Sequence, residues 1–392
     1  MLSLLGDNTL YTVLPDPTIW SRAGLTFGWV GVLLGVNRIV RVVFNTGAGV
    51  LYDRLPRRRL LIGSLALGAI CNVIYAIAFG PALFLLGRVL WGAAWSGLWI
   101  GGNTIVLDVS TEATRGRNSG RFQMWFFIGV AVGGLFGGAS TDLMGFRAGL
   151  LVSAALTGLG ALLWYFKLPE TRPDDGGEKT QVPGWREFPI RQSIPAAVPL
   201  MAVRFVFAGV MAATTILWLE RYVGRELSLA WIVVPLATLT GAFSAIRVLT
   251  SIVGAPIAGK VSDRLGRRWP VMAMGLGMGA IGAWLMGGSV IWLALFGALL
   301  AAVTSGSVQA LSPAIIGDRV EERRQSRALS VMFSLGDVAS ALGPPLALGL
   351  LAVLGISGVY RMSAVVLALA GVFALAQTRR EPVIRAAETA AK

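Results

Sequence analysis

Apolar runs recur along the whole 392-residue chain, and most of them are long enough to cross a bilayer as helices. A spanning helix needs about 20 residues. The runs predict spans at 2–14, 26–51, 60–79, 82–107, 121–142, 146–166, 193–219, 229–258, 269–287, 291–316, 328–355 and 358–377. Charged residues make up only 14% of the chain, against about 25% in soluble proteins. We therefore expect an all-α integral membrane protein with twelve transmembrane helices.

The longest polar stretch follows the sixth span and divides the chain into two halves. It covers 168–192 and is rich in Pro, Asp, Gly, Glu, Lys and Arg. The expected organisation is a six-helix bundle over 1–167, a cytoplasmic linker over 168–192, a second six-helix bundle over 193–378 and a tail over 379–392. One chain then holds a complete six-plus-six unit, which favours a monomer.

The first span is shorter than the others. Residues 2–14 would rise only about 20 Å as a helix, against a hydrocarbon core of about 30 Å. Pro15 ends the run. The sequence therefore predicts that the first helix is truncated in this chain. The register of the internal repeat described below puts the missing portion at about one and a half dozen residues.

Basic residues are concentrated in alternate loops. Of the 34 Lys and Arg residues, 24 lie in one set of loops and in the tail. The opposite set carries only Arg22, Arg147, Arg221, Arg225 and Arg361. Because basic loops stay cytoplasmic, we expect both termini on the cytoplasmic side of the plasma (inner) membrane. This placement also accounts for the net charge of +14 without a nucleic-acid partner.

Several chemistries lack the residues that they need. The chain has no histidine, and Cys71 is its single cysteine, which excludes histidine-based triads, histidine–metal sites and internal disulfides. No nucleotide-binding P-loop and no pairing of a nucleophile with a base is present. We expect no enzymatic activity, no metal and no cofactor.

An internal repeat relates the two halves at an offset of 210 residues. Residues 49–58 read GVLYDRLPRR and residues 259–268 read GKVSDRLGRR, so six residues coincide. Asp108 matches Asp318 at the same offset. Repeated halves are typical of secondary transporters, whose sites lie between the halves near the bilayer midplane.

The repeated loop resembles the signature loop of the major facilitator superfamily (MFS). Its two copies comprise Gly49, Asp53, Arg54, Arg57 and Arg58, and Gly259, Asp263, Arg264, Arg267 and Arg268. In the first copy, Pro56 replaces the later glycine. The resemblance implies the MFS fold, as in twelve-helix proton-coupled antiporters, and conformational gating by this loop. In that role Asp53 would face Ser326, and Asp263 would face Ser119. Alternatively, the acids neutralise nearby arginines, or the loops are only positive-inside anchors.

Two further motifs resemble those of the same family. Arg88, followed by Trp91 and Gly92, resembles its helix-four motif, which implies a gating role for Arg88. The glycines of helix five resemble the glycine–proline motif of its proton-driven antiporters, although Gly134 stands where that motif has proline. They are Gly129, Gly133, Gly134, Gly137 and Gly138. Independently of the resemblance, this spacing is typical of close helix packing.

Charged residues within the spans point to a transport site, since a charge at midplane is expensive and seldom idle. Arg38, Arg41 and Asn45 share one face of the second span, and Asn37 lies off that face. The candidate substrate-binding residues are Arg38, Arg41, Asn45, Trp91, Trp95, Arg204 and Arg247. Alternatively, the arginines tie helices together or snorkel to an interface, and the tryptophans hold Arg88 or face lipid.

Apart from Asp142, the last residue of its span, only two acids, Asp7 and Asp337, lie within the spans. Burial raises the pKa of a carboxyl group and a nearby arginine lowers it, so either acid could carry a coupling proton. The alternative is a purely structural Asp–Arg pair. The sequence therefore favours a secondary transporter that couples protons to efflux of a drug-like or amphipathic compound. The alternatives are uptake or exchange of an organic anion or metabolite through an arginine-lined cavity, and a non-transporting membrane receptor.

Overall fold

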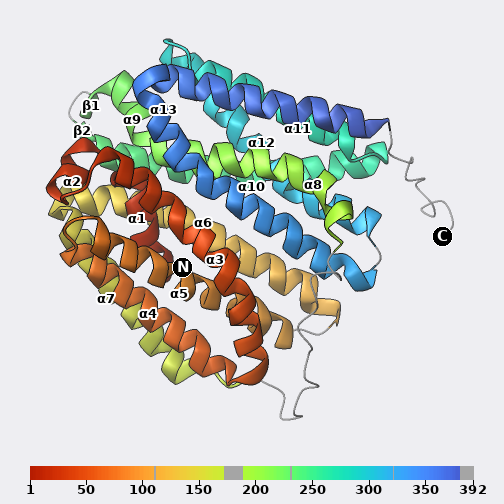
Figure 1. Cartoon of the computed structure of the whole chain (residues 1–392), viewed down its shortest axis with the longest axis horizontal. Helices are drawn as coiled ribbons and strands as arrows, with labels where there is room; N and C mark the ends of the chain where they lie inside the picture. The colour runs from red at the N-terminus through yellow and green to blue at the C-terminus, as the bar shows by residue number, and fades with distance from the viewer. Residues whose placement is uncertain (110–111, 172–188, 230–231, 321, 380–392) are drawn as a thin grey trace. The chain divides into compact units, whose positions relative to one another are not determined.

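The computed structural model describes residues 1–109, 112–171, 189–229, 232–320 and 322–379, and nearly all of them are helical (Figure 1). The first half contains the short 3-10 helix η1 (Leu2–Leu4), α1 (Leu5–Val13), α2 (Pro17–Arg22), α3 (Phe27–Arg54), α4 (Arg57–Ile77), α5 (Pro81–Asp108), α6 (Glu112–Met144) and α7 (Phe146–Lys167). The second half contains α8 (Ile190–Val203), the π-helical turn η3 (Arg204–Met211), α9 (Ala212–Val223), β1 (Glu226–Leu229), β2 (Ile232–Pro235), α10 (Leu236–Leu265), α11 (Trp269–Met286), α12 (Ile291–Arg319) and α13 (Glu322–Thr378).

Helices occupy all twelve predicted spans. Ten helices within the described residues are long and apolar enough to cross a membrane. The last, Ala328–Thr378, has 51 residues and covers two predicted spans, because the chain leaves helical geometry at Gly355 (φ 61°). The remaining predicted span corresponds to η1 and α1. The positive φ favours glycine at 355, because other residues meet a steric penalty there.

The predicted span at 229–258 begins too early. Residues 232–235 form the strand β2, which pairs antiparallel with β1, and the helix starts only at Leu236. Ile232, Val233 and Val234 are β-branched residues, which favour strands. They join the following helix as one continuous apolar run, so hydropathy alone could not separate strand from helix.

The residues group into two compact units. Unit 1 comprises Met1–Val182 and Ala213–Ile246, and unit 2 comprises Pro183–Ala212 and Arg247–Lys392. Within unit 1, α1 packs on α6, α3 on α5, and α4 on both α5 and α7. Within unit 2, α11 packs on α12 and α13, and α8 packs on α13.

Large apolar side chains are exposed on the outer surfaces of the helices. Leu143 is 82% exposed and Val353 is 80% exposed. In a soluble protein such surfaces would promote association, whereas in a bilayer they contact lipid tails. The interior combines large apolar side chains with many alanines and serines, and these small residues allow helices to approach closely.

Candidate functional site

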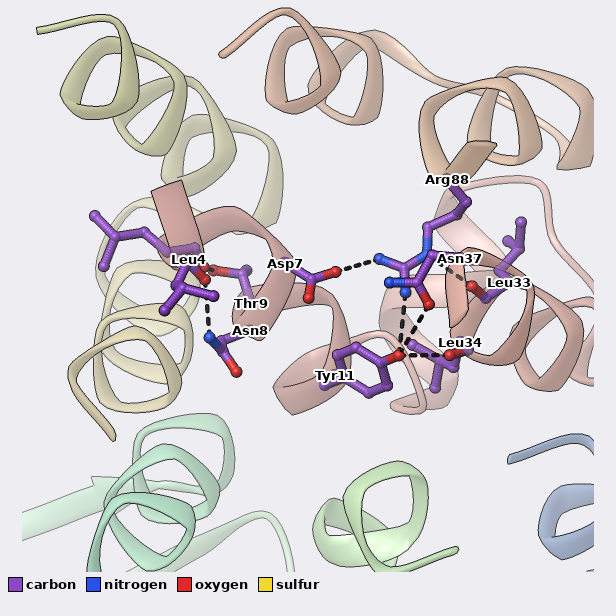
Figure 2. Close-up of polar contacts among 10 residues, drawn as sticks. Leu4, Asp7, Asn8, Thr9, Tyr11, Leu33, Leu34, Asn37 and Arg88 are labelled. Atoms are coloured by element: carbon purple, nitrogen blue, oxygen red, sulfur yellow. Dashed lines mark hydrogen bonds and ion pairs between the residues drawn. The ribbon is translucent and has the colours of Figure 1, made fainter. Parts of the chain in front are cut away.

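A buried ion pair joins α1 to α5 in unit 1 (Figure 2). The guanidinium of Arg88 donates to Asp7 Oδ1 at 2.5 Å, and the residue is only 1% exposed. Its Nε donates to the carbonyl oxygen of Leu33 at 2.7 Å, and its Nη2 donates to the hydroxyl of Tyr11 at 3.2 Å. Arg88 therefore keeps two neutral acceptors besides the carboxylate, which compensate for the burial of its charge.

Tyr11 connects this pair to α3. Its hydroxyl donates to the carbonyl oxygen of Leu34 at 2.5 Å and lies 3.3 Å from Oδ1 of Asn37 (Figure 2). The guanidinium carbons of Arg38 and Arg88 lie 5.1 and 5.3 Å from the centre of the Tyr11 ring, within the range of cation–π attraction. Sequence reasoning placed Asn37 off the polar stripe and did not identify Tyr11. The available signal was the i, i+4 spacing of Asp7 and Tyr11 on one helix.

A second ion pair lies in unit 2. Arg204, the first residue of η3, donates to Asp337 Oδ1 of α13 at 2.5 Å. The guanidinium of Arg204 also lies 5.3 Å from the centre of the Phe333 ring. A Cβ atom at Gly336 would come within 2.8 Å of the Arg204 side chain, so the arginine packs directly along α13. Asp7 and Asp337 are thus each bonded to an arginine.

The other candidate substrate residues have varied surroundings. Arg41 lies 5.8 Å from the ring centre of Trp95. The Oδ1 of Asn45 is buried without a hydrogen-bond partner in the described part of the chain. Arg247 is half-buried in α10, with Tyr360 among its electrostatic neighbours.

Aromatic residues of α5 and α6 form a continuous cluster. The rings of Trp95 and Trp99 stack at 5.9 Å, and Phe126 lies 5.0 Å from Trp99 in an edge-on arrangement. Trp91 lies next to Trp95 on the same face of α5 but is only 1% exposed, and its ring packs against Gly68 of α4. Trp91 therefore packs between helices, whereas Trp99 and Phe126 are partly exposed.

The five glycines of α6 lie on two faces of that helix. A Cβ at Gly129, Gly133 or Gly137 would come within 3.0 Å of η1 or α1. A Cβ at Gly138 would lie 2.0 Å from the carbonyl oxygen of Ala237, in α10. Gly134 is more open, because its nearest neighbour, in Ser244, would be 3.6 Å away. The glycines let α6 pack closely against α1 on one side and against α10 on the other.

The two copies of the repeated loop use their arginines in similar ways. In unit 1, Arg57 pairs with Asp108, and the two oxygens of Glu170 accept from the backbone N–H groups of Arg57 and Arg58 at 2.9 and 3.2 Å. In unit 2, Arg268 pairs with Asp318 at 2.5 Å. Asp108 and Asp318, which match in the sequence repeat, thus each bind an arginine of their own loop. The two arginines are neighbouring positions of the repeat, because Arg57 corresponds to Arg267 and Arg58 corresponds to Arg268.

Asp263 also binds Arg268, at 3.0 Å, and so neutralises an arginine of its own loop. Burial lowers the pKa of the Arg268 guanidinium, but the bonds to Asp318 and Asp263 outweigh this effect and leave the pKa raised. The side chains of Asp53, Ser119 and Ser326 are outside the described part of the structure. The expected contacts of Asp53 with Ser326 and of Asp263 with Ser119 therefore stay predictions. Arg54 and Arg264 are exposed, Arg267 is half-buried, and Gly49 and Gly259 have open space at their Cα atoms.

Two groups of polar contacts, around Asp16 and around Asp142, lie at the end of unit 1 opposite to the repeated loop. Asp16 caps α2 through Thr18 and binds Arg225 at 2.6 Å, and Arg225 also binds Glu220 at 2.9 Å. The hydrogen bond to Asp16 raises the pKa of the Arg225 guanidinium more than burial lowers it. Asp142, in the last turn of α6, accepts from the backbone N–H and the hydroxyl of Thr238 at 2.6 Å each.

Among the described residues, no group of three or more His, Cys, Asp or Glu side chains forms a potential metal site. The polar groups that contact one another within the membrane-spanning helices are carboxylates, guanidinium groups and hydroxyls. Inside a bilayer, carboxylates can bind and release protons, and all three kinds of group can bind polar solutes. Several membrane-spanning helices with ion pairs inside them are typical of membrane transporters.

Comparison with known proteins identifies the family. A sequence model of the Major Facilitator Superfamily matches residues 1–249 and 236–392. The chain is 26% identical over 325 residues to the class G tetracycline resistance protein of Vibrio anguillarum, which covers 81% of this chain and 79% of that protein. It is 29% identical over 173 residues to the inner membrane transport protein YajR of Escherichia coli (strain K12), over 42% of this chain and 36% of that protein.

A solved structure shows the same fold. The bacterial homologue of the human lysosomal transporter Spinster, in an inward-facing and occupied conformation, superposes with a TM-score of 0.77 at 18% identity, over 96% of this chain and 94% of that one. The chain belongs to the Major Facilitator Superfamily. It is a multi-pass secondary transporter of the membrane, which confirms the family and fold expected from the sequence.

Proposed function

We propose that this transporter exports drug-like or amphipathic compounds in exchange for protons, with Asp7 and Asp337 as the proton sites. The observation that carries the proposal is that each of these acids is bonded to an arginine at 2.5 Å within membrane-spanning helices. A carboxylate is the natural carrier, because the chain has no histidine and arginine stays protonated.

The surroundings of Asp7 suit repeated protonation. When Asp7 takes up a proton, it loses its charge and its attraction for Arg88. Arg88 nevertheless keeps its bonds to Leu33 and Tyr11, so its buried charge retains acceptors. Removing one partner from a buried ion pair costs about 3–5 kcal/mol when nothing replaces it. These neutral acceptors reduce that cost and make the protonated state accessible.

The site at Asp337 offers the same chemistry in unit 2. Arg204 lies at the start of a π-helical turn, a geometry that occurs frequently at functional sites. Protonation of Asp337 would free Arg204 to turn towards another anion or an aromatic ring. Two acid–arginine pairs, one in each unit, supply separate binding positions for protons.

The aromatic cluster of α5 and α6 supports an amphipathic substrate. Trp99 and Phe126 present partly exposed ring surfaces, on which a planar compound can stack. Relatives named tetracycline resistance proteins, class G and class C, match about four-fifths of this chain. A transporter confers resistance most directly by export, and this favours efflux as the direction.

The alternative is uptake or exchange of an organic anion, and the placement of two arginines favours it. Arg38 and Arg41 lie on one helix, beside the rings of Tyr11 and Trp95 respectively. A guanidinium beside an aromatic ring is well suited to an aromatic carboxylate, because it supplies both a bidentate donor and a stacking surface. The double variant Arg38→Gln/Arg41→Gln tests this alternative. If benzoate and tetracycline bind at different residues, the variant should lose benzoate transport and keep tetracycline transport.

Transport into everted vesicles under an imposed pH gradient tests the coupling. We expect an acidic vesicle interior to drive accumulation of tetracycline, the probe suggested by the relatives. Asp7→Asn and Asp337→Asn should each abolish gradient-driven accumulation yet permit exchange of tetracycline across the membrane without a gradient. Glu226→Gln, at an exposed carboxylate of β1, is the matched control and should behave as wild type. Full gradient-driven accumulation in both aspartate variants would refute proton coupling at these residues.

We also propose the orientation that the basic loops predict, with both termini in the cytoplasm. The loops that contain Arg57 and Arg268 would then close the cytoplasmic side of the transporter. Their arginines are held by Asp108 and Asp318 within each unit, so each loop can move as one body with its own helices. Cysteine labelling at Arg59 and at Arg361, with an impermeant reagent, should modify only the second position in intact cells.

A further inference from the structure

A cavity of about 450 Å³ lies at one end of unit 1. It is lined by the end of α2, by Ala78 just after α4, and by Thr141 and residues 144–148, where α6 ends and α7 begins. Its volume is within the range of small-molecule sites, about 300–1,000 Å³. Proton coupling, as proposed above, does not use this cavity.

The cavity is positively charged. Arg22 and Arg147 line it, and they are two of only five basic residues in the loops opposite to the basic set. None of the described residues that line the cavity is acidic. The acid nearest in sequence, Asp142, binds Thr238 instead. The positive-inside rule leaves these arginines unexplained, since it predicts few cations on this side.

The backbone adds to this positive potential. Gly145, at a φ of 87°, turns the chain from α6 into α7, and α7 begins without a side-chain cap. Phe146 and Ala148, in the first turn of α7, also line the cavity. The amide groups of a first helical turn have no acceptor within the helix, and they favour an anion.

The position of the cavity indicates where its ligand comes from. It lies where α4 and α6 end and α7 begins, and helix termini in a membrane protein lie near the lipid headgroups. Phe79 and Leu143, beside the lining residues, are 68% and 82% exposed. Exposed apolar side chains of this size face lipid tails in a bilayer, so the cavity borders on lipid.

We propose that this cavity binds the phosphodiester headgroup of an anionic phospholipid, with Arg22 and Arg147 as donors to its non-bridging oxygens. Arginine matches phosphate geometry because its planar group can donate two parallel hydrogen bonds. Glycerol oxygens of the same headgroup can accept from the first turn of α7, and the acyl chains can leave along Phe79 and Leu143. Arginines that merely snorkel to the interface would not need to converge on one concave surface.

Thermal stability of the purified full-length protein in neutral detergent tests this assignment. Phosphatidylglycerol is compared with phosphatidylcholine at equal mole fraction, because a ligand that binds the native state raises its apparent Tm by mass action. We expect a rise in Tm with phosphatidylglycerol that phosphatidylcholine does not give. In the double variant Arg22→Gln/Arg147→Gln the apparent affinity for phosphatidylglycerol should fall about tenfold or more.

Three comparisons make the outcome decisive. Arg361→Gln removes an exposed arginine from the same predicted side but outside the cavity, and it should keep the full phosphatidylglycerol effect. The single variant Arg22→Gln repeats the test if the double variant does not fold. An equal rise in Tm with inorganic phosphate would overturn the lipid assignment in favour of a free-anion site. An unchanged phosphatidylglycerol effect in the arginine variants would overturn the site itself.

Discussion

Contact between α6 and α10 can be tested by adding a single methyl group at Gly138. The Cβ of an alanine there would lie 2.0 Å from the carbonyl oxygen of Ala237 and 2.6 Å from its carbonyl carbon. Ordinary contacts at such positions are 3.4–4 Å, so the backbones must separate by more than about 1 Å. Both atoms belong to backbones, and no rotamer change can relieve the clash.

The expected cost follows from two effects. Overpacking of a well-packed interface costs about 1–3 kcal/mol. Separation of the helices also stretches the bonds from Asp142 to Thr238, one turn beyond Gly138, and hydrogen bonds to charged groups contribute about 1.5–3 kcal/mol. We therefore expect Gly138→Ala to destabilise the protein by about 2–4 kcal/mol, because the stretched bonds are weakened and not abolished.

Gly134→Ala is the matched control on the same helix. Its Cβ would meet Ser244 at 3.6 Å and the carbonyl oxygen of Gly241 at 3.7 Å, both ordinary contacts. Alanine also favours the helix over glycine by about 1 kcal/mol, so this variant should be neutral or slightly stabilised. Unfolding followed by intrinsic tryptophan fluorescence should show an apparent Tm lower by about 2–5 °C for Gly138→Ala alone. Equal shifts in the two variants would refute the close approach of α6 and α10.

Three further outcomes are expected. Asn72→Leu should raise the apparent Tm, because both polar atoms of this fully buried amide lack hydrogen-bond partners among the described residues, and an unpaired buried group costs about 1–3 kcal/mol; a lower Tm would show that the amide is paired. Asp16→Asn should lower the Tm by an amount that shrinks in 1 M NaCl, since salt screens the pair with Arg225, whose side chain is 49% exposed; a salt-independent loss would contradict this. Asp318→Asn should speed trypsin cleavage after Arg268 more than Asp263→Asn does, because the bond from Asp318 is the shorter one.

Single helices were predictable from the sequence because their signal is local. Hydropathy located the spans, and the 210-residue offset paired Asp108 with Asp318 before any contact was known. A structural Asp–Arg pair was one of the alternatives that the sequence left open for Asp7 and Asp337. The particular partner was not predictable, because Asp7 and Arg88 lie 81 residues apart and meet only through tertiary packing.

Asn37 illustrates a different limit. A helical wheel of α3 places it away from Arg38 and Arg41, and sequence reasoning therefore set it aside. In the structure it is 2% exposed, because α1 covers that side of α3 with Tyr11. A wheel describes one helix and carries no information about which neighbours surround it. The strand β2 was missed for a related reason, since its β-branched residues read as the start of the following helix.

The π-helical turn Arg204–Met211 affects how residues in this span are matched with those of other transporters. A π-helical turn closes hydrogen bonds one residue farther along the chain than an α-helix does, so it holds an additional residue in nearly the same length. Each residue of an α-helix turns the side-chain direction by about 100°. An alignment without a gap across this turn would therefore assign Thr215 and Trp218 to the wrong face of the helix whenever the other protein is α-helical there. An alignment of this span with another transporter should therefore match the buried residues of the two helices and allow a one-residue gap between positions 204 and 211.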